Sequence, residues 1–233
     1  MIRGDNVDLV LHVARRLGHL VERVVFLGGA ATGLLITDPG APPPRPTKDV
    51  DVVIEVASTV EYMGQLRDEL RSLGFNEDTE EGAPLCRWII EDVKVDVMPT
   101  SGDVLGFTNR WYGAALAHAV RFEVATGLAV RLVTAPYFLA TNLEAFSGRG
   151  ADDFAASHDL EDFLAVVDGR PGIEGEVARA DAEVRCYLAQ KIGELLEDTR
   201  FLDALPGHLP GDIASQARLP SLTDRLRRLA TMV

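Results

Sequence analysis

Two stretches of the sequence decide the expected fold: Val-Val-Phe-Leu-Gly-Gly at residues 24–29 and Asp-Val-Asp-Val-Val-Ile-Glu-Val at residues 49–56. The first ends a short apolar run, residues 21–27, whose β-branched side chains predict a strand. The Gly28-Gly29 pair then predicts a tight turn, because glycine adopts backbone conformations that other residues avoid. A helical pattern follows, so the expected order is strand, turn, helix.

The second stretch predicts a strand with two acidic residues on one face. Its period of two places Asp49 and Asp51 on the same side of the expected sheet. Residues 37–48, which precede it, are rich in proline. Proline lacks a backbone donor and fixes φ, so this segment predicts a loop.

Asp96 lies in a second expected β region. Residues 85–91 and 93–98 predict two strands joined by a tight corner, and Asp96 falls in the middle of the second. A carboxylate between valines needs a cation or hydrogen bonds if its face is buried. We therefore expect the sheet to bring Asp96 close to Asp49 and Asp51.

Helical patterns cover most of the remaining chain. Residues 5–19 and 58–73 have helical spacing, and after a short expected strand at 129–133 nearly all of the sequence does. This change of pattern predicts an α/β (α+β) core at residues 1–133 and a helical C-terminal domain at residues 134–233.

The composition of the 233 residues is that of a globular protein, with 47% hydrophobic and 25% charged residues. The formal net charge of -13 disfavours nonspecific binding to nucleic acid, because that binding depends on Lys and Arg neutralising phosphates. Arginines gather at 110–131 and at 225–228. Charge groups of this size are more often solvated faces than basic grooves.

Several other classes of site and location are disfavoured. No apolar run approaches the roughly 20 residues needed to cross a bilayer, and the N-terminus lacks the apolar core of a secretory signal. Cys86 and Cys186 lie far apart without a Cys-x-x-Cys or Cys/His cluster, which argues against zinc or a disulfide framework. The expected location is cytoplasmic, with no membrane partner.

Three neighbouring aspartates predict a divalent metal site. Carboxylates brought together repel one another unless a cation or protons compensate them. Hard oxygen ligands suit Mg²⁺, with Mn²⁺ as the alternative, and such ions assist nucleotidyl transfer. We expect catalytic and metal-binding roles for Asp49, Asp51 and Asp96. Gly28 and Gly29, at a helix start, are expected to bind the triphosphate of a nucleotide.

Each of these motifs is common when it occurs alone. Asp-x-Asp at a strand start is usually a solvated turn, and Gly-Gly after a strand is usually only a turn, so their combination and order carry the prediction. Residues 28–33 match neither the P-loop pattern nor Gly-x-Gly-x-x-Gly, and no serine hydrolase elbow is present. Other phosphate-binding folds therefore gain no support.

The motifs Phe-Leu-Gly-Gly-Ala-Ala-Thr (26–32), Thr-Lys-Asp-Val-Asp (47–51) and Lys-Val-Asp-Val-Met (94–98) resemble the signature of polymerase-β-like nucleotidyltransferases. This resemblance implies a nucleotidyltransferase core with a mixed sheet flanked by helices, plus a helical C-terminal part. Residues 141–146, 148–150 and 157–162 more narrowly resemble the AbiEii/AbiGii toxin nucleotidyltransferases, relatives of the MenT toxins.

The resemblance implies a metal-dependent enzyme that moves a nucleoside monophosphate from an NTP to an acceptor hydroxyl. In such toxins the acceptor is RNA, at the 3′ end of tRNA, and an antitoxin protein is the partner. By this analogy Asp49 and Asp51 hold metal and triphosphate. Asp96 completes the metal site and helps to deprotonate the acceptor, and Asp159 supports the nucleotide site.

The sequence departs from that family at Asn142, where such toxins usually carry a lysine that contacts the triphosphate. An amide cannot supply a positive charge, so Lys48, Arg45 and Arg149 become candidates for the missing cation. Two alternatives stay open. One is transfer to a small molecule or a protein, which the net charge of -13 slightly favours. The other is a nucleotide-binding or partner-binding module with weakened catalysis.

Overall fold

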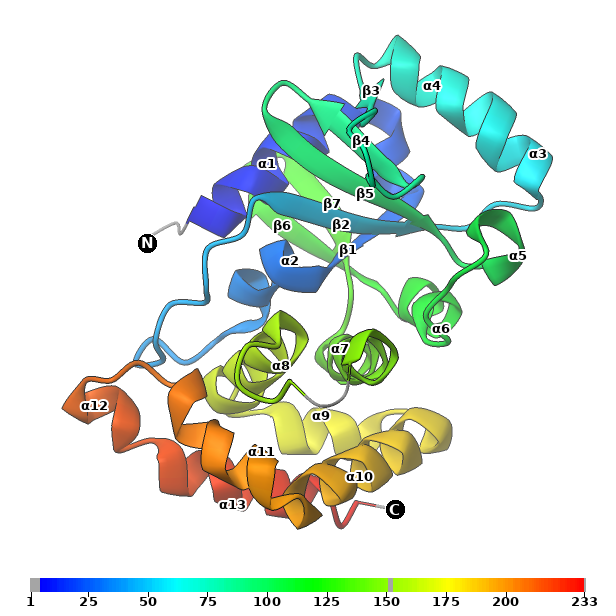
Figure 1. The fold of residues 1–233 in the computed structure, drawn as a ribbon. Helices are drawn as coiled ribbons and strands as arrows, with labels where there is room; N and C mark the ends of the chain where they lie inside the picture. The colour runs from blue at the N-terminus through cyan, green and yellow to red at the C-terminus, as the bar shows by residue number, and fades with distance from the viewer. Residues whose placement is uncertain (1–4, 151–152, 233) are drawn as a thin grey trace. The chain divides into compact units, whose positions relative to one another are not determined.

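The computed structural model describes residues 5–150 and 153–232, which form two compact units (Figure 1). The first unit comprises Met1–Gly33 and Pro46–Thr134, and the second comprises Leu34–Arg45 and Ala135–Val233, less the residues outside the described ranges. Residues 37–45 of the proline-rich loop thus belong to the second unit. The expected domains, 1–133 and 134–233, stay a prediction.

A mixed seven-stranded sheet organises the first unit, in the order β3-β4-β5-β2-β1-β7-β6 (Figure 1). The strands are β1 (Val24–Leu27), β2 (Asp49–Ile54), β3 (Asn76–Glu77), β4 (Arg87–Ile90), β5 (Val93–Pro99), β6 (Val120–Ala125) and β7 (Leu128–Leu132). β2 pairs in parallel with β5 and antiparallel with β1, and β1 pairs in parallel with β7. The expected α/β class with a mixed sheet is confirmed.

Helices flank this sheet. They are α1 (Asp5–Leu17), η1 (Gly18–Glu22), α2 (Gly28–Leu35), α3 (Thr59–Glu61), η2 (Tyr62–Leu66), α4 (Arg67–Ser72), α5 (Gly102–Leu105) and α6 (Tyr112–Ala117). Val10, Val13 and Leu17 recur at helical spacing on α1 and are buried, so α1 packs against the sheet through one apolar face. The expected helix at 58–73 is present as one helical run, in which η2 forms a π-helical turn.

The second unit is helical, as expected for this part of the chain. Its helices are α7 (Ala135–Gly150), α8 (His158–Gly169), α9 (Ile173–Arg179), α10 (Ala182–Glu197), α11 (Thr199–Ala204), η3 (Leu205–His208), α12 (Ile213–Gln216) and α13 (Leu219–Leu229). The proline-rich loop is anchored here, because the amides of Thr37 and Asp38 both donate to the carbonyl of Gly169 at 2.9 Å. Arg218 adds ion pairs to Asp38 and Asp168, both at 2.7 Å.

Three sequence expectations need correction or comment. Residues 18–22 form a 3-10 turn, so the first strand begins at Val24 rather than at residue 21. The edge strand β6 was not expected, because half of its residues are exposed and the arginines around it obscure the apolar alternation. No helix in the described part of the chain is long and apolar enough to cross a membrane.

The arginines of the C-terminal group are engaged within the second unit. Arg225 donates to the carbonyls of Val167 and Asp168, and Arg228 binds Glu174 through two hydrogen bonds of 2.9 and 2.8 Å. Arg228 is about half exposed, as a solvated face predicts, whereas Arg225 is only 15% exposed and has a structural role in this unit.

Candidate active site

The sheet places three carboxylates on one face. In the parallel pairing of β2 with β5, Asp51 is the partner of Asp96, and Asp49 is the partner of Lys94. Residues paired across neighbouring strands point to the same face, and so do residues two apart on one strand. Asp51 and Asp96 are therefore direct neighbours, and Asp49 lies one step further along β2.

Gly28 lies against Asp51. Leu27 is opposite Asp51 in the antiparallel pairing of β1 with β2, and Gly28 follows it with φ of 66° at the start of α2. A Cβ atom at Gly28 would approach the carboxyl carbon of Asp51 to 2.8 Å. Only glycine combines this backbone conformation with this approach, so the diglycine turn and the carboxylates share one location.

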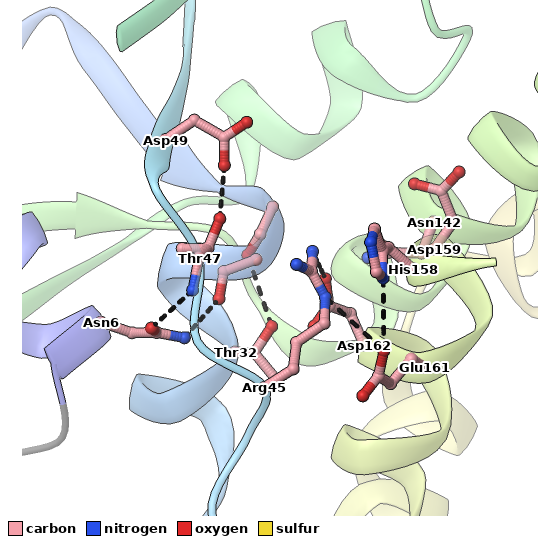
Figure 2. A network of polar contacts seen from close by, with 12 residues as sticks. Asn6, Thr32, Arg45, Thr47, Asp49, Asn142, His158, Asp159, Glu161 and Asp162 are labelled. Carbon is pink, nitrogen blue, oxygen red and sulfur yellow. Dashed lines mark hydrogen bonds and ion pairs between the residues drawn. The ribbon is translucent and has the colours of Figure 1, made fainter. Parts of the chain in front are cut away.

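Asn6 connects the diglycine turn to the segment that leads into β2 (Figure 2). Its buried side chain donates from Nδ2 to the carbonyl of Gly29 at 3.3 Å and accepts at Oδ1 from the amide of Thr47 at 3.1 Å. The hydroxyl of Thr47 in turn donates to Asp49 Oδ1 in a short hydrogen bond. Asn6 thus holds the turn and the start of β2 in a fixed relation.

Arg87 neutralises Asp96. The two residues are opposite each other in the antiparallel pairing of β4 with β5, and Asp96 is only 8% exposed. Arg87 donates from Nε to Oδ1 at 2.8 Å and from Nη2 to Oδ2 at 2.7 Å, which is a bidentate, charge-assisted pair. The hydrogen bond to Asp96 raises the pKa of Arg87, against the opposing effect of burial. The negative charge of Asp96 is therefore compensated by Arg87.

The donor set at this face suits a divalent cation. Carboxylate oxygens are the ligands that Mg²⁺ prefers, and the missing side chain at Gly28 lets the Asp51 carboxylate lie against the backbone of the turn. Within residues 5–150 and 153–232, no three His, Cys, Asp or Glu side chains are arranged to hold a metal ion. The metal-binding role of the three acids stays a prediction.

Asn142 makes a hydrogen bond within its own helix. It is 6% exposed on α7, and its Nδ2 donates to the carbonyl of Phe138 at 2.9 Å. The amide therefore satisfies the helix backbone at the position where the resemblance leads one to expect a lysine. Lys48, which immediately precedes Asp49, is exposed.

Asp159 belongs to a charged cluster of the second unit (Figure 2). Burial raises the pKa of Asp159, while Arg149, whose Nη2 lies 3.7 Å from Oδ1, acts in the opposite direction. Arg45 pairs with the buried Asp162 at 2.8 Å. His158 is exposed, with Nδ1 3.3 Å from a carboxylate oxygen of the next turn of the helix. Of the three candidate cations, Arg45 and Arg149 are thus paired with acids of their own unit.

The fold of the chain is similar to that of a solved nucleotidyltransferase-like protein. An antigenic nucleotidyltransferase-like protein from Paracoccidioides brasiliensis has a TM-score of 0.51 at 22% sequence identity, and the match covers 86% of this chain and 93% of that chain. The fold is nucleotidyltransferase-like. The antibiotic-resistance factor ANT(2'')-Ia has a TM-score of 0.41 at 18% identity, covering 69% of this chain and 81% of that one.

The comparisons by sequence give no family. No protein-family model matches the chain, and no curated protein matches it either. The narrower resemblance to the AbiEii/AbiGii toxins therefore stays a prediction based on the motifs quoted above.

Proposed function

We propose that this protein is a metal-dependent nucleotidyltransferase, which moves a nucleoside monophosphate from an NTP to an acceptor hydroxyl. One observation carries the proposal: Gly28 lies directly against Asp51, and Asp51 is the parallel-strand partner of Asp96. The diglycine turn at the start of α2 and this carboxylate pair are neighbours within a nucleotidyltransferase-like fold, which supports the proposal. Neither feature alone would favour nucleotide chemistry over a solvated turn.

Different residues would bind the triphosphate and the metal ion. The diglycine turn opens α2, whose first amides point outward without partners in the helix and suit the phosphates of an NTP. Asp49 and Asp51 are the residues that would hold Mg²⁺ or Mn²⁺, and such an ion, when bound, neutralises charge on phosphate oxygens. Lys48 would supply positive charge close to Asp49. The family resemblance gives Asn142 and Asp159 nucleotide-binding roles as well.

The reaction would be an in-line substitution at the α-phosphorus. The acceptor hydroxyl oxygen forms the new bond to phosphorus, while the bond from phosphorus to the bridging oxygen of the β-phosphate breaks and pyrophosphate leaves. Asp96 would take the hydroxyl proton, as a carboxylate neighbouring Asp51 on the same face of the sheet. Positioning of the acceptor in line with the leaving group accounts for a large part of the rate of such reactions.

The acceptor is proposed to be RNA, at the 3′ end of tRNA, in a toxin-like role with an antitoxin protein as partner. The support is the resemblance of residues 141–146, 148–150 and 157–162 to toxin nucleotidyltransferases. A small-molecule or protein acceptor is the second candidate, favoured by the net charge of -13, which weakens attraction to a polyanion.

One experiment separates these acceptors. The purified protein is incubated with total RNA and each of the four labelled NTPs, with and without Mg²⁺, alongside Asp51→Ala. Label that appears on tRNA only with Mg²⁺ and only with the unaltered protein supports the RNA proposal. Mass spectrometry of the protein and of small acceptors after the same incubation detects the second candidate. Absence of transfer from all four NTPs to any acceptor contradicts the proposed activity.

A further inference from the structure

The strand β6 forms one edge of the sheet in the first unit. Within the described residues it pairs with β7 on one side only, because the order of strands ends in β1-β7-β6 (Figure 1). An edge strand presents backbone amides and carbonyls with which a strand of another chain can pair. The opposite edge, β3, comprises only Asn76–Glu77 and offers far less backbone. β6 is therefore the edge to which a further strand can add.

The side chains of β6 leave this edge accessible. Val120 is 47% exposed, the side chain of Arg121 is 73% exposed, and Glu123 is exposed as well. The strand contains no proline, so each of its amides is a potential donor. The irregularity in the pairing with β7 lies between Glu123 and Ala125. Residues 120–123 thus offer a strand edge in regular register.

The charges of β6 match a second copy of the same strand in one register. Arg121 and Glu123 are two residues apart, so their side chains lie on the same face of the sheet. In an antiparallel pair of two β6 strands centred on Phe122, Arg121 of each copy lies opposite Glu123 of the other. A pair centred on Arg121 or on Glu123 would set like charges opposite each other. Charge therefore selects a register with two-fold symmetry.

Arg121 is poorly compensated within its own chain. Its direct neighbour on β7 is Arg131, and like charges opposite each other in a sheet are destabilising. Glu22 lies 3.6 Å from Arg121, but both side chains are more than half exposed, so this ion pair contributes little. A carboxylate on the free side of β6 would offset the repulsion between the two arginines. Glu123 of a second copy supplies one in the register centred on Phe122.

We propose that the protein forms a symmetric dimer in which two β6 strands pair in antiparallel orientation, centred on Phe122, and join two sheets into one. Arg121 and Glu123 form two ion pairs between the copies, and the two Phe122 side chains lie next to each other on the other face. The strand is short and each copy carries a formal charge of -13, so the dimer is weak and depends on concentration. This inference is independent of the proposed function.

Charge reversal tests the register. Analytical ultracentrifugation measures the dissociation constant of the unaltered protein, of Arg121→Glu and of Glu123→Arg. Each single reversal sets like charges opposite each other at two places, so it should weaken self-association at least about tenfold. A mixture of the two variants sets two glutamates of one opposite two arginines of the other, so it should form a heterodimer. Arg227→Glu, at an exposed position on α13, is the control and should associate like the unaltered protein.

Hydrogen exchange locates the contact without any variant. The amides of β6 should exchange more slowly at high protein concentration than at low, while those of Asn76 and Glu77 on the opposite edge should exchange equally fast at both. A protein that stays monomeric up to about 0.5 mM, where even a modest affinity is detectable, overturns the inference. A dimer whose β6 amides gain no protection overturns it too. So does a dimer that both reversals leave unchanged, or a pair of variants that does not associate when mixed.

Discussion

Gly28 lies so close to Asp51 that a Cβ atom at position 28 would overlap the Asp51 carboxylate. A Cβ at Gly28 would come within 2.8 Å of the carboxyl carbon of Asp51, and the backbone there has φ of 66°. The strand pairing of β1 with β2 enforces this approach, because Leu27 is opposite Asp51. Residue 28 therefore has to be glycine if the turn and the Asp51 carboxylate are to keep this arrangement.

The substitution Gly28→Ala should destabilise the protein and remove NTP binding. The left-handed backbone conformation of a non-glycine residue costs about 1–2 kcal/mol, and the overlap with Asp51 adds to this cost. Urea unfolding gives the first quantity and binding of a fluorescent NTP analogue gives the second. Gly64→Ala is the control, because a Cβ there meets nothing within 4 Å; it should leave NTP binding unchanged and not lower stability, since alanine favours the helical run that contains it. Normal NTP binding by Gly28→Ala would contradict the role of the turn.

The substitution Asp51→Asn should abolish transfer without unfolding the protein. Removing one charge relieves repulsion with Asp96, so the free energy of unfolding should stay the same or rise, while the transfer rate falls at least about a hundredfold. Single-turnover transfer of labelled nucleotide and urea unfolding measure the two effects. Asp92→Asn, an exposed acid in the turn between β4 and β5, should leave the rate unchanged. A rate equal to that of the unaltered protein would rule out the carboxylate site.

The substitution Asn6→Ala should lower both stability and activity. Two side-chain hydrogen bonds are lost from a residue that is 4% exposed, at roughly 1 kcal/mol each, so about 2 kcal/mol is expected. Urea unfolding measures this loss, and the transfer rate reports the misplacement of Asp49. The exposed Asn76→Ala should change stability by less than about 0.5 kcal/mol. An equal change in the free energy of unfolding for Asn6→Ala and Asn76→Ala would show that the hydrogen bonds of Asn6 do not stabilise the turn and the start of β2.

The strands β2 and β5, and the acidic residues within them, could be predicted from the sequence for a physical reason. A strand buried on one face shows its period of two directly, so β2 and β5 were expected with Asp49, Asp51 and Asp96 within them. The strand β6 was missed because it is an exposed edge, where burial does not select apolar residues. The local pattern of apolar residues thus predicts the strands that form the core, but it does not predict an exposed edge strand.

The side chains that contact the site residues could not be predicted from the sequence. Asn6 contacts Thr47 across 41 residues, and Arg45 pairs with Asp162 across 117 residues, so neither contact leaves a local signal. Arg87 lies only 9 residues from Asp96, within an expected pair of strands. Its role could have been inferred from the hairpin register, which sets Arg87 opposite Asp96, but no motif fixes that register.

Asp159 makes the stability of the protein depend on pH. Because burial raises its pKa above 3.8, the folded state binds this proton more tightly than the unfolded state, and stability is lost as the pH rises through the folded-state pKa. Asp159→Asn should therefore raise the melting temperature at pH 7.5, and the gain should shrink as the pH falls toward 3.8. Asp203→Asn, on an exposed position, is the control. A lower melting temperature for Asp159→Asn at pH 7.5 would show that contacts of the charged form dominate.

Asn142→Lys tests whether residue 142, where the AbiEii/AbiGii toxins usually carry a lysine, contacts the triphosphate. If this position contacts the triphosphate, a lysine should strengthen NTP binding by about tenfold, because a direct charge contact replaces a neutral amide. Titration with a fluorescent NTP analogue measures the change, with Asn142→Gln as a neutral control of similar length. Unchanged affinity in Asn142→Lys would remove this position from the nucleotide site. A large rise in transfer rate would identify the natural protein as a weakened enzyme.

The central claim is that the carboxylates of Asp49 and Asp51 and the turn at Gly28 form one site for a divalent ion and a triphosphate. Crystals grown with Mn²⁺ and a non-hydrolysable NTP analogue test it most directly, because anomalous scattering locates the ion. The account predicts an anomalous peak on Asp49 and Asp51, with the triphosphate on the amides of Gly28 and Gly29. An ion or a nucleotide bound elsewhere, with these carboxylates unliganded, would contradict it.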